Sequence, residues 1–164
     1  MSRALSPTVV IVHLIATWFM VGLIWTIHIV HYPLFAEVGD ATYVAFQAAH
    51  VERIGALLAL PWAVEGITAA AILLGAFTAR DRGLLPPAVI GAAAMGVVLI
   101  ISGFWSAPAH GELADGFDPD VHARLMTADL VRMLAWTVRG LCAAWITAVV
   151  IRRLVRPVGV SPAR

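Results

Sequence analysis

The sequence predicts an all-α integral membrane protein, built as a bundle of four membrane-spanning helices. Three observations support this fold class: 61% of the 164 residues are hydrophobic, only 13% are charged, and the mean hydropathy is +0.90. A soluble domain is typically about a quarter charged, so these charges are too few to cover a water-facing surface. Four apolar segments are long enough to supply the ~20 residues that cross ~30 Å of hydrocarbon: 8–30, 54–77, 84–105 and 128–151.

The first segment is expected to be a retained helix. Arg3 precedes it, as in a signal peptide, but the apolar stretch exceeds the roughly 7–15 residues of a signal-peptide core and no A-x-A-like cleavage site follows. Proline is expected to end this helix at Pro33, within "HYPLF".

The helix that contains the second segment is expected to begin outside the bilayer. A helical period starts at Tyr43, with Asp40 or Thr42 as the N-cap. The turn "ARDRG" is short, so the second and third helices are expected to form an antiparallel pair within a four-helix bundle.

The connection between the third and fourth segments combines a breaker region with a helix start. The stretch "SAPAHGELADGF" contains two glycines and a proline, and is expected to be a loop or a short surface helix. Asp118 followed by Pro119 predicts the N-cap and the first position of the last helix.

Arginine is distributed unevenly and predicts the orientation. The N-terminus, the short turn and the tail are basic, whereas the connections 31–53 and 106–127 are acidic on balance. By the positive-inside rule, both termini are expected to lie in the cytoplasm of a bacterium, with the chain in its inner membrane. A single domain is expected over 1–156, with a flexible cytoplasmic tail at 157–164. The basic residues on the cytoplasmic side are Arg3, Arg80, Arg82, Arg152, Arg153, Arg156 and Arg164.

Two charged residues are predicted to lie near the middle of the bilayer. Glu65 and Arg139 each lie eleven residues inside the outer boundary of their segments, which is ~16 Å at ~1.5 Å per residue. A single charge at this depth costs at least ~2.5–3.5 kcal/mol. Equal depth and opposite sign therefore predict a buried ion pair.

Polar residues at helical spacing are predicted to line a cavity in the outer half of the bundle. Five of the six histidines fall on that side, although His110 is expected to be a surface residue. Imidazole is a common ligand of transition metals, so four of them are candidate metal or haem ligands: His28, His31, His50 and His122. The candidate cavity and ligand-binding residues are Tyr32, Arg53, Asp129, Arg132 and Trp136.

Two function classes are excluded by composition. The net charge of +1 provides no basic surface for nucleic acid. Cys142 is the only cysteine, which excludes an intramolecular disulfide and paired-cysteine redox chemistry.

Three motifs carry a family resemblance: "W..H..HYPLF" at 25–35, "F...H..RIG" at 46–55 with Pro61 and Glu65 after it, and "H..L..GFD...H.RL.T..L.R...W..RG" at 110–140. Together they resemble an uncharacterised family of small four-span bacterial integral membrane proteins. The resemblance covers most of the chain and implies a four-span membrane fold, but no cofactor or substrate. In that family His often stands in place of Gln47, and Asn-Trp in place of Ala128-Asp129.

Three hypotheses for the function follow, and we favour the first. It is a redox enzyme of the membrane that depends on haem or a transition metal, with Arg132 and Arg139 holding a propionate or a substrate carboxylate. The second is a binding or transport module for an anionic or lipidic small molecule, for which a homodimer is expected. The third is a structural subunit whose polar face meets a partner protein. In every case the surrounding partner is the lipid bilayer.

Overall fold

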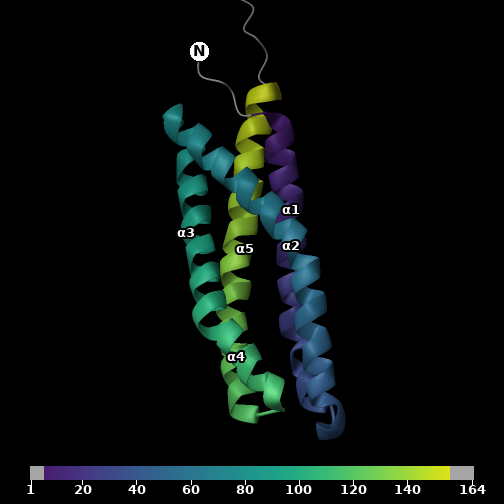
Figure 1. The fold of residues 1–164 in the computed structure, drawn as a ribbon. Coiled ribbons are helices and arrows are strands. Elements are labelled where there is room, and N and C mark those ends of the chain that lie inside the picture. Colours follow the sequence, from purple (N-terminus) through teal and green to yellow (C-terminus); the bar gives the residue numbers. More distant parts are fainter. Residues whose placement is uncertain (1–5, 156–164) are drawn as a thin grey trace, which may run out of the picture.

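The computed structural model describes residues 6–155, which form helices joined by short connections and contain no strand. Figure 1 shows the long helices side by side, with the start of α1 and the end of α5 at the same end of the bundle. In chain order the elements are α1 (Pro7–Thr26), the π-helical turn η1 (Ile27–His31), the 3-10 turn η2 (Pro33–Glu37), α2 (Asp40–Thr78), α3 (Leu85–Ile101), the π-helical turn η3 (Ser102–Ser106), α4 (Ala107–Glu112), the 3-10 turn η4 (Leu113–Asp115) and α5 (Pro119–Val155).

The predicted all-α fold is confirmed for the described residues. Four helical runs are long and apolar enough to cross a membrane, judged by length and composition: Pro7–Glu37, Asp40–Thr78, Leu85–Asp115 and Pro119–Val155. Each predicted segment falls within one of these runs, apart from Leu84 at the start of the third. The runs are longer than predicted because helical structure continues past the apolar residues at the end opposite to the start of α1.

Helix α5 lies at the centre of the bundle, where it packs against both α1 and α3, and α2 packs against α1 and α3. Close contact between α1 and α5 depends on Gly140. A Cβ atom at this position would lie 3.0 Å from Val21 Cγ2 and 3.4 Å from Trp18 Cε2. A larger residue would therefore push the two helices apart.

The first helix ends at His31, just before Pro33 as expected, but helical turns continue beyond the proline. The chain passes from α1 through η1 into η2, where Pro33 occupies the first position. Proline is tolerated there because the first N–H groups of a helical turn have no partner within the turn. The turn is closed instead by Phe35 N, which donates to Tyr32 O at 3.0 Å.

Helix α2 begins at Asp40 with Gly39 as its N-cap, and no side chain caps it. The prediction that Asp40 or Thr42 is the N-cap is therefore wrong. Asp40 lies in the first turn, where its negative charge is favourable beside the helix N-terminus. The Thr42 hydroxyl donates to the Gly39 carbonyl. Further along, Pro61 lies inside the helix and lacks the N–H of one backbone hydrogen bond. Figure 1 shows α2 inclined across the bundle toward α3.

Of the two alternatives expected between the third and fourth segments, a loop or a short surface helix, the structure has the helix. η3, α4 and η4 continue from α3 without a break as far as Asp115. Pro108 is accommodated in the first turn of α4, and the run ends at Gly116, whose φ of 148° suits only glycine. The predicted start of α5 is confirmed, because Asp118 Oδ1 accepts from the backbone N–H groups of Asp120 (2.8 Å) and Val121 (3.0 Å).

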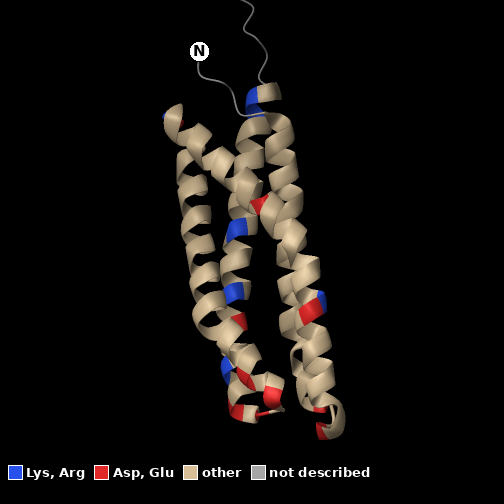
Figure 2. Cartoon of the chain, viewed as in Figure 1, with Lys and Arg blue, Asp and Glu red and all other residues tan. Residues whose placement is uncertain are grey.

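The two ends of the bundle differ in charge, as Figure 2 shows. The end that holds the start of α1 and the end of α5 carries Arg80, Arg82, Arg152 and Arg153, whereas the opposite end carries Glu37, Asp40, Glu112, Asp115, Asp118 and Asp120. Arg3, Arg156, Arg164 and the predicted tail at 157–164 lie outside the described residues.

A single carboxylate joins the α2–α3 turn to the end of α5 at the arginine-rich end. Asp81 Oδ1 accepts from the backbone N–H groups of Gly83 (2.9 Å) and Leu84 (3.2 Å). Arg153 donates to both Asp81 oxygens, at 2.5 and 2.8 Å. The Arg153 hydrogen bonds, helped by the two backbone N–H groups, lower the pKa of Asp81 to about 2, although partial burial opposes the shift.

Asp81 should make part of the stability depend on pH. A carboxylate whose pKa falls on folding stabilises the protein above its unfolded pKa, and loses this contribution as the pH falls through the folded pKa. Because Arg153 is exposed, we expect a contribution of only about 0.2–1 kcal/mol, lost between about pH 4 and about pH 2. Unfolding of detergent-solubilised wild type and Asp81→Asn across this range measures it. Parallel pH curves for the two proteins would contradict the assignment.

Candidate functional site

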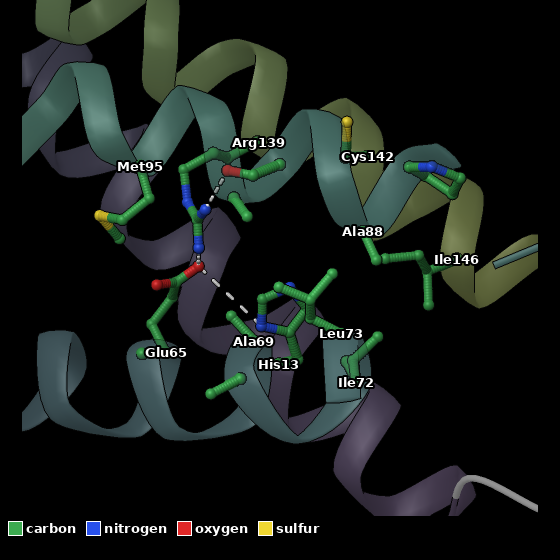
Figure 3. A pocket seen from close by; sticks show the side chains of 15 residues that line it. His13, Glu65, Ala69, Ile72, Leu73, Ala88, Met95, Arg139, Cys142 and Ile146 are labelled. Carbon is green, nitrogen blue, oxygen red and sulfur yellow. Dashed lines mark hydrogen bonds and ion pairs between the residues drawn. The ribbon is translucent and has the colours of Figure 1, made fainter. Parts of the chain in front are cut away.

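A buried ion pair connects all four long helices. Glu65 of α2 is 0% exposed and Arg139 of α5 is 3% exposed. Arg139 donates through one terminal nitrogen to Glu65 Oε1 and through the other to the Gly91 carbonyl of α3, as Figure 3 shows. Thr17 of α1 donates to the same Glu65 oxygen at 3.3 Å. The pair that the sequence predicts is therefore present, and it forms the centre of a hydrogen-bond network that includes every long helix.

His13 lies close to the Glu65 carboxylate of this pair. Its Nδ1 is 3.1 Å from Thr68 Oγ1 and 3.9 Å from Glu65 Oε1. The Thr68 hydroxyl already donates to backbone carbonyls of its own helix, so its oxygen can only accept and His13 Nδ1 donates. In the ion pair itself, Glu65 Oε2 and Arg139 Nε are buried and have no hydrogen-bond partner. Both residues line a hollow of about 210 Å³, which we call the inner cavity.

A second polar network is centred on Asp129, which is 0% exposed. His28 donates from Nδ1 to one carboxylate oxygen at 3.1 Å, and Arg132 donates to the other at 2.5 Å. The same Arg132 nitrogen also contacts Tyr32 Oη at 3.3 Å. Three of the predicted site residues, from η1 and α5, are thus joined to Tyr32 in one network, within which Asp129 balances the charge of Arg132.

Tyr32 is held from the other side by His110, whose Nε2 lies 2.9 Å from Tyr32 Oη. Gln47 Nε2 contacts the His110 carbonyl at 3.3 Å and His110 Nδ1 at 3.0 Å. The carbonyl can only accept, so the Gln47 amide nitrogen faces His110 and donates to both atoms. Neutral His110 then carries its proton on Nε2 and donates to Tyr32. Because Tyr32 Oη accepts from both His110 and Arg132, its own proton is free for another acceptor.

His31 and His50 form a separate pair. His31 Nε2 lies 2.8 Å from His50 Nδ1, so one ring donates to the other. The remaining nitrogen of His50, Nε2, is buried without a partner. Arg53, which is exposed, lies beside this pair at a hollow of about 220 Å³ and is absent from the network of Asp129. The fourth predicted ligand, His122, donates from Nε2 to the Tyr32 carbonyl at 2.8 Å.

The four predicted metal or haem ligands are therefore not gathered at one point. His31 and His50 are together, whereas His28 and His122 are bonded to Asp129 and to the backbone. Within residues 6–155, no group of three or more His, Cys, Asp or Glu side chains is arranged to hold a metal ion.

A cavity of about 190 Å³, which we call the outer cavity, lies between the two networks. Its polar lining includes Tyr32, His110 and Arg132, and its apolar walls include Ile24 and Leu58. The predicted site residue Trp136 also lines it and lies 5.4 Å from the Arg139 guanidinium, in a cation–π contact. Four polar atoms of the lining are buried and have no hydrogen-bond partner: Trp62 Nε1, Ser102 Oγ, Ser106 Oγ and Arg132 Nε.

The two serines are unusual among the hydroxyl residues of these helices. The Thr68, Thr127 and Thr137 hydroxyls all donate to carbonyls of their own helix, as helical threonines commonly do. Ser102 and Ser106 make no such bond. They stand at the two ends of η3, and the other π-helical turn, η1, leads directly to Tyr32. Single π-helical turns occur often at functional sites, and here both adjoin one cavity.

Several residues of this site are not predicted from the sequence. His110 is expected on the surface, but it is half-buried and holds Tyr32. Ser102 lies in the third apolar segment and Ser106 begins the stretch "SAPAHGELADGF", and neither serine is a predicted site residue. The available signal was spacing: Ser102, Ser106 and His110 are four residues apart, which places them on one helix face.

No family model, no curated protein and no solved structure matches this chain. The function is therefore argued from the geometry of the two networks and the two cavities.

The central ion pair can be tested by a double-mutant cycle. Glu65→Gln leaves Arg139 charged and unpaired in the interior, which should lower the free energy of unfolding by about 3–5 kcal/mol. Adding Arg139→Gln should recover part of that loss, because the unpaired charge is removed as well. Denaturant unfolding in detergent micelles gives the three differences. Strictly additive effects of the two substitutions would show that the side chains do not interact.

Proposed function

We propose that this chain is a multi-pass protein of the bacterial inner membrane that binds a small apolar molecule, through its carbonyl groups, in the outer cavity. Four helices with the length and composition of membrane spans support the membrane assignment. The arginine-rich end supports cytoplasmic termini and a single four-span domain over 1–156, with the acidic end outside. The outer cavity then lies in the extracytoplasmic half of the bundle.

The observation that carries the proposal is the set of unpartnered polar atoms around the outer cavity. Trp62 Nε1 and Arg132 Nε can only donate hydrogen bonds, and the hydroxyls of Ser102 and Ser106 can donate as well. The free proton of Tyr32 adds a further donor. A buried donor without an acceptor costs about 1–3 kcal/mol. A ligand that brings acceptors into the cavity would remove several such costs at once.

A neutral carbonyl group satisfies these donors better than a carboxylate does. Asp129 already balances Arg132 at 2.5 Å, so a carboxylate would add an uncompensated charge inside the membrane. Such a charge costs at least ~2.5–3.5 kcal/mol. The remaining walls, which include Leu23, Ile27 and Ile54, are apolar. A quinone-like ring, with carbonyl oxygens on an apolar body, fits both properties.

The structural-subunit hypothesis loses its main support in this geometry. An exposed polar stripe within lipid would require a partner protein, but Glu65, Asp129 and Arg139 are all buried within the chain.

Ligand selectivity tests this proposal. In the purified protein, an alkyl benzoquinone should raise the unfolding midpoint, whereas an alkylbenzene of the same chain length should have little effect. Replacing both serines, Ser102→Ala with Ser106→Ala, should weaken quinone binding about tenfold, because two hydrogen bonds of roughly 0.5–1.5 kcal/mol are lost.

The matched control is Thr127→Ala with Thr147→Ala. These hydroxyls bond to carbonyls of their own helix and line neither the outer nor the inner cavity, so quinone binding should be unchanged. Equal stabilisation by the quinone and the alkylbenzene, or an unchanged affinity in the serine variant, would refute the proposal.

A metal- or haem-dependent redox role is the second candidate, and one observation favours it. His31 Nε2 and His50 Nδ1 lie 2.8 Å apart. Two imidazole nitrogens bound to one tetrahedral ion, each at about 2.0–2.1 Å, are about 3.3 Å apart. A small rotation of either ring would therefore allow both to bind the same ion. Exposed Arg53 beside them suits a haem propionate or another anionic ligand.

Metal analysis with an absorption spectrum tests this second candidate. Protein from cells grown with iron and copper should contain stoichiometric metal or show a Soret band, and His31→Ala or His50→Ala should remove it. His122→Ala is the matched control, because its ring bonds to the Tyr32 carbonyl. Metal-free wild-type protein, or unchanged metal content in the His31 and His50 variants, would exclude these ligands.

A further inference from the structure

The inner cavity differs from the outer cavity in location and in lining. It is lined by α2, α3 and α5 and by His13 of α1, and no residue lines both cavities. Its space arises from small side chains on the facing surfaces of two helices. These are Gly66, Ala69 and Ala70 on α2 and Ala88, Gly91 and Ala92 on α3.

The two residues of the central ion pair both line this cavity, and each has a buried atom without a partner. Glu65 Oε2 belongs to a carboxylate that is 0% exposed, and Arg139 Nε belongs to a side chain that is 3% exposed. The other oxygen of Glu65 is occupied by Arg139 and Thr17. Figure 3 shows Glu65 and Arg139 at one side of the cavity, with Leu73, Ala88 and Ile146 along the rest.

These two atoms require opposite hydrogen-bonding groups from a guest. Glu65 Oε2 needs a donor and Arg139 Nε needs an acceptor. A carbonyl has no proton for Glu65, and an ammonium group has no lone pair for Arg139. A hydroxyl group provides both. Because Glu65 and Arg139 balance each other, an uncharged head group also leaves the buried charge neutral.

Most of the remaining lining selects an apolar body for the guest, and the other polar groups that line the cavity are the His13 imidazole and the Cys142 thiol. Ile72, Leu73, Met95 and Ile146 contribute only hydrocarbon and thioether surface. One water molecule corresponds to about 30 Å³ of liquid, so a water bound between the two polar atoms would leave most of the 210 Å³ unfilled. Apolar space of this kind is better filled by hydrocarbon than by water.

The mouth of the inner cavity lies on the side of the bundle. Gly66, Ala70 and Ala92 line the cavity and are also exposed on the surface of α2 and α3. In a membrane this surface would face lipid, so a guest would enter from the bilayer. We propose that the inner cavity is a second binding site, which takes an apolar molecule with a single hydroxyl head, such as an alkylphenol, from the lipid phase.

The probes are three compounds with the same hydrocarbon chain: 4-hexylphenol, 4-hexylanisole and hexylbenzene. The anisole keeps an acceptor for Arg139 Nε but has no proton for Glu65 Oε2, and hexylbenzene has neither. Apparent affinities come from the rise of the unfolding midpoint of the full chain in detergent with probe concentration. We expect 4-hexylphenol to bind about tenfold more tightly than 4-hexylanisole, and hexylbenzene to bind most weakly.

Two variants place the binding in the inner cavity. Ala69→Leu fills it and should abolish the preference for the phenol. Ala92→Leu, on the exposed rim, should do the same by covering the mouth, and it disturbs the interior less. Ala63→Leu is the matched control, because Ala63 is exposed on α2 and lines neither the inner nor the outer cavity. It should bind the phenol as the wild type does.

The test is independent of the outer cavity. Ser102→Ala with Ser106→Ala should leave phenol binding unchanged, even if the quinone proposal fails. Equal affinity for 4-hexylphenol and 4-hexylanisole would overturn the proposal. So would wild-type phenol binding in folded Ala69→Leu and Ala92→Leu.

Discussion

The contact between Glu65 and Arg139 is the interaction on which the rest of the structure depends. Either charge alone would be costly in the middle of an apolar bundle. Together they also engage Thr17 of α1 and the Gly91 carbonyl of α3, so the four long helices meet at one neutral, hydrogen-bonded point. Because a salt bridge of this kind requires defined partner positions, it fixes the depth and rotation of each helix relative to the others.

The two cavities lie on either side of Trp136 and Arg139, and they differ in the hydrogen bonds they leave unmade. The outer cavity presents mainly donors, including Trp62 Nε1 and Arg132 Nε. The inner cavity presents one acceptor and one donor, Glu65 Oε2 and Arg139 Nε. The two proposed sites therefore differ in preference: the outer one takes acceptors only, as in a carbonyl, and the inner one takes a donor and an acceptor, as in a hydroxyl group. Their size is similar, so chemistry rather than shape separates the proposed guests.

Much of the fold can be predicted from the sequence, because membrane spans depend on apolar length and on arginine at the flanks. The pairing of Glu65 with Arg139 can be predicted equally well, because two isolated charges of opposite sign at equal depth have few other partners. The position of His110 is not predictable in the same way. Its segment contains glycine and proline and is typical of a loop or a short surface helix, and it folds as a helix that continues α3. Helical spacing by itself could not show that this continuation returns His110 to Tyr32.

The π-helical turn η1 has a consequence for the way α1 and its extension could change. A π-helical turn holds one residue more than an α-helical turn of the same span. Loss of one residue between Ile27 and His31 would restore a regular α-helix without breaking it. Winding the same residues as regular α-helix without that loss would instead rotate everything beyond them by about 100°, the angle per residue in an α-helix. Tyr32 would turn away from Arg132 and His110 while the preceding part of α1 stayed in place. The extra residue in η1 therefore determines the rotation of Tyr32 and the residues beyond it independently of α1.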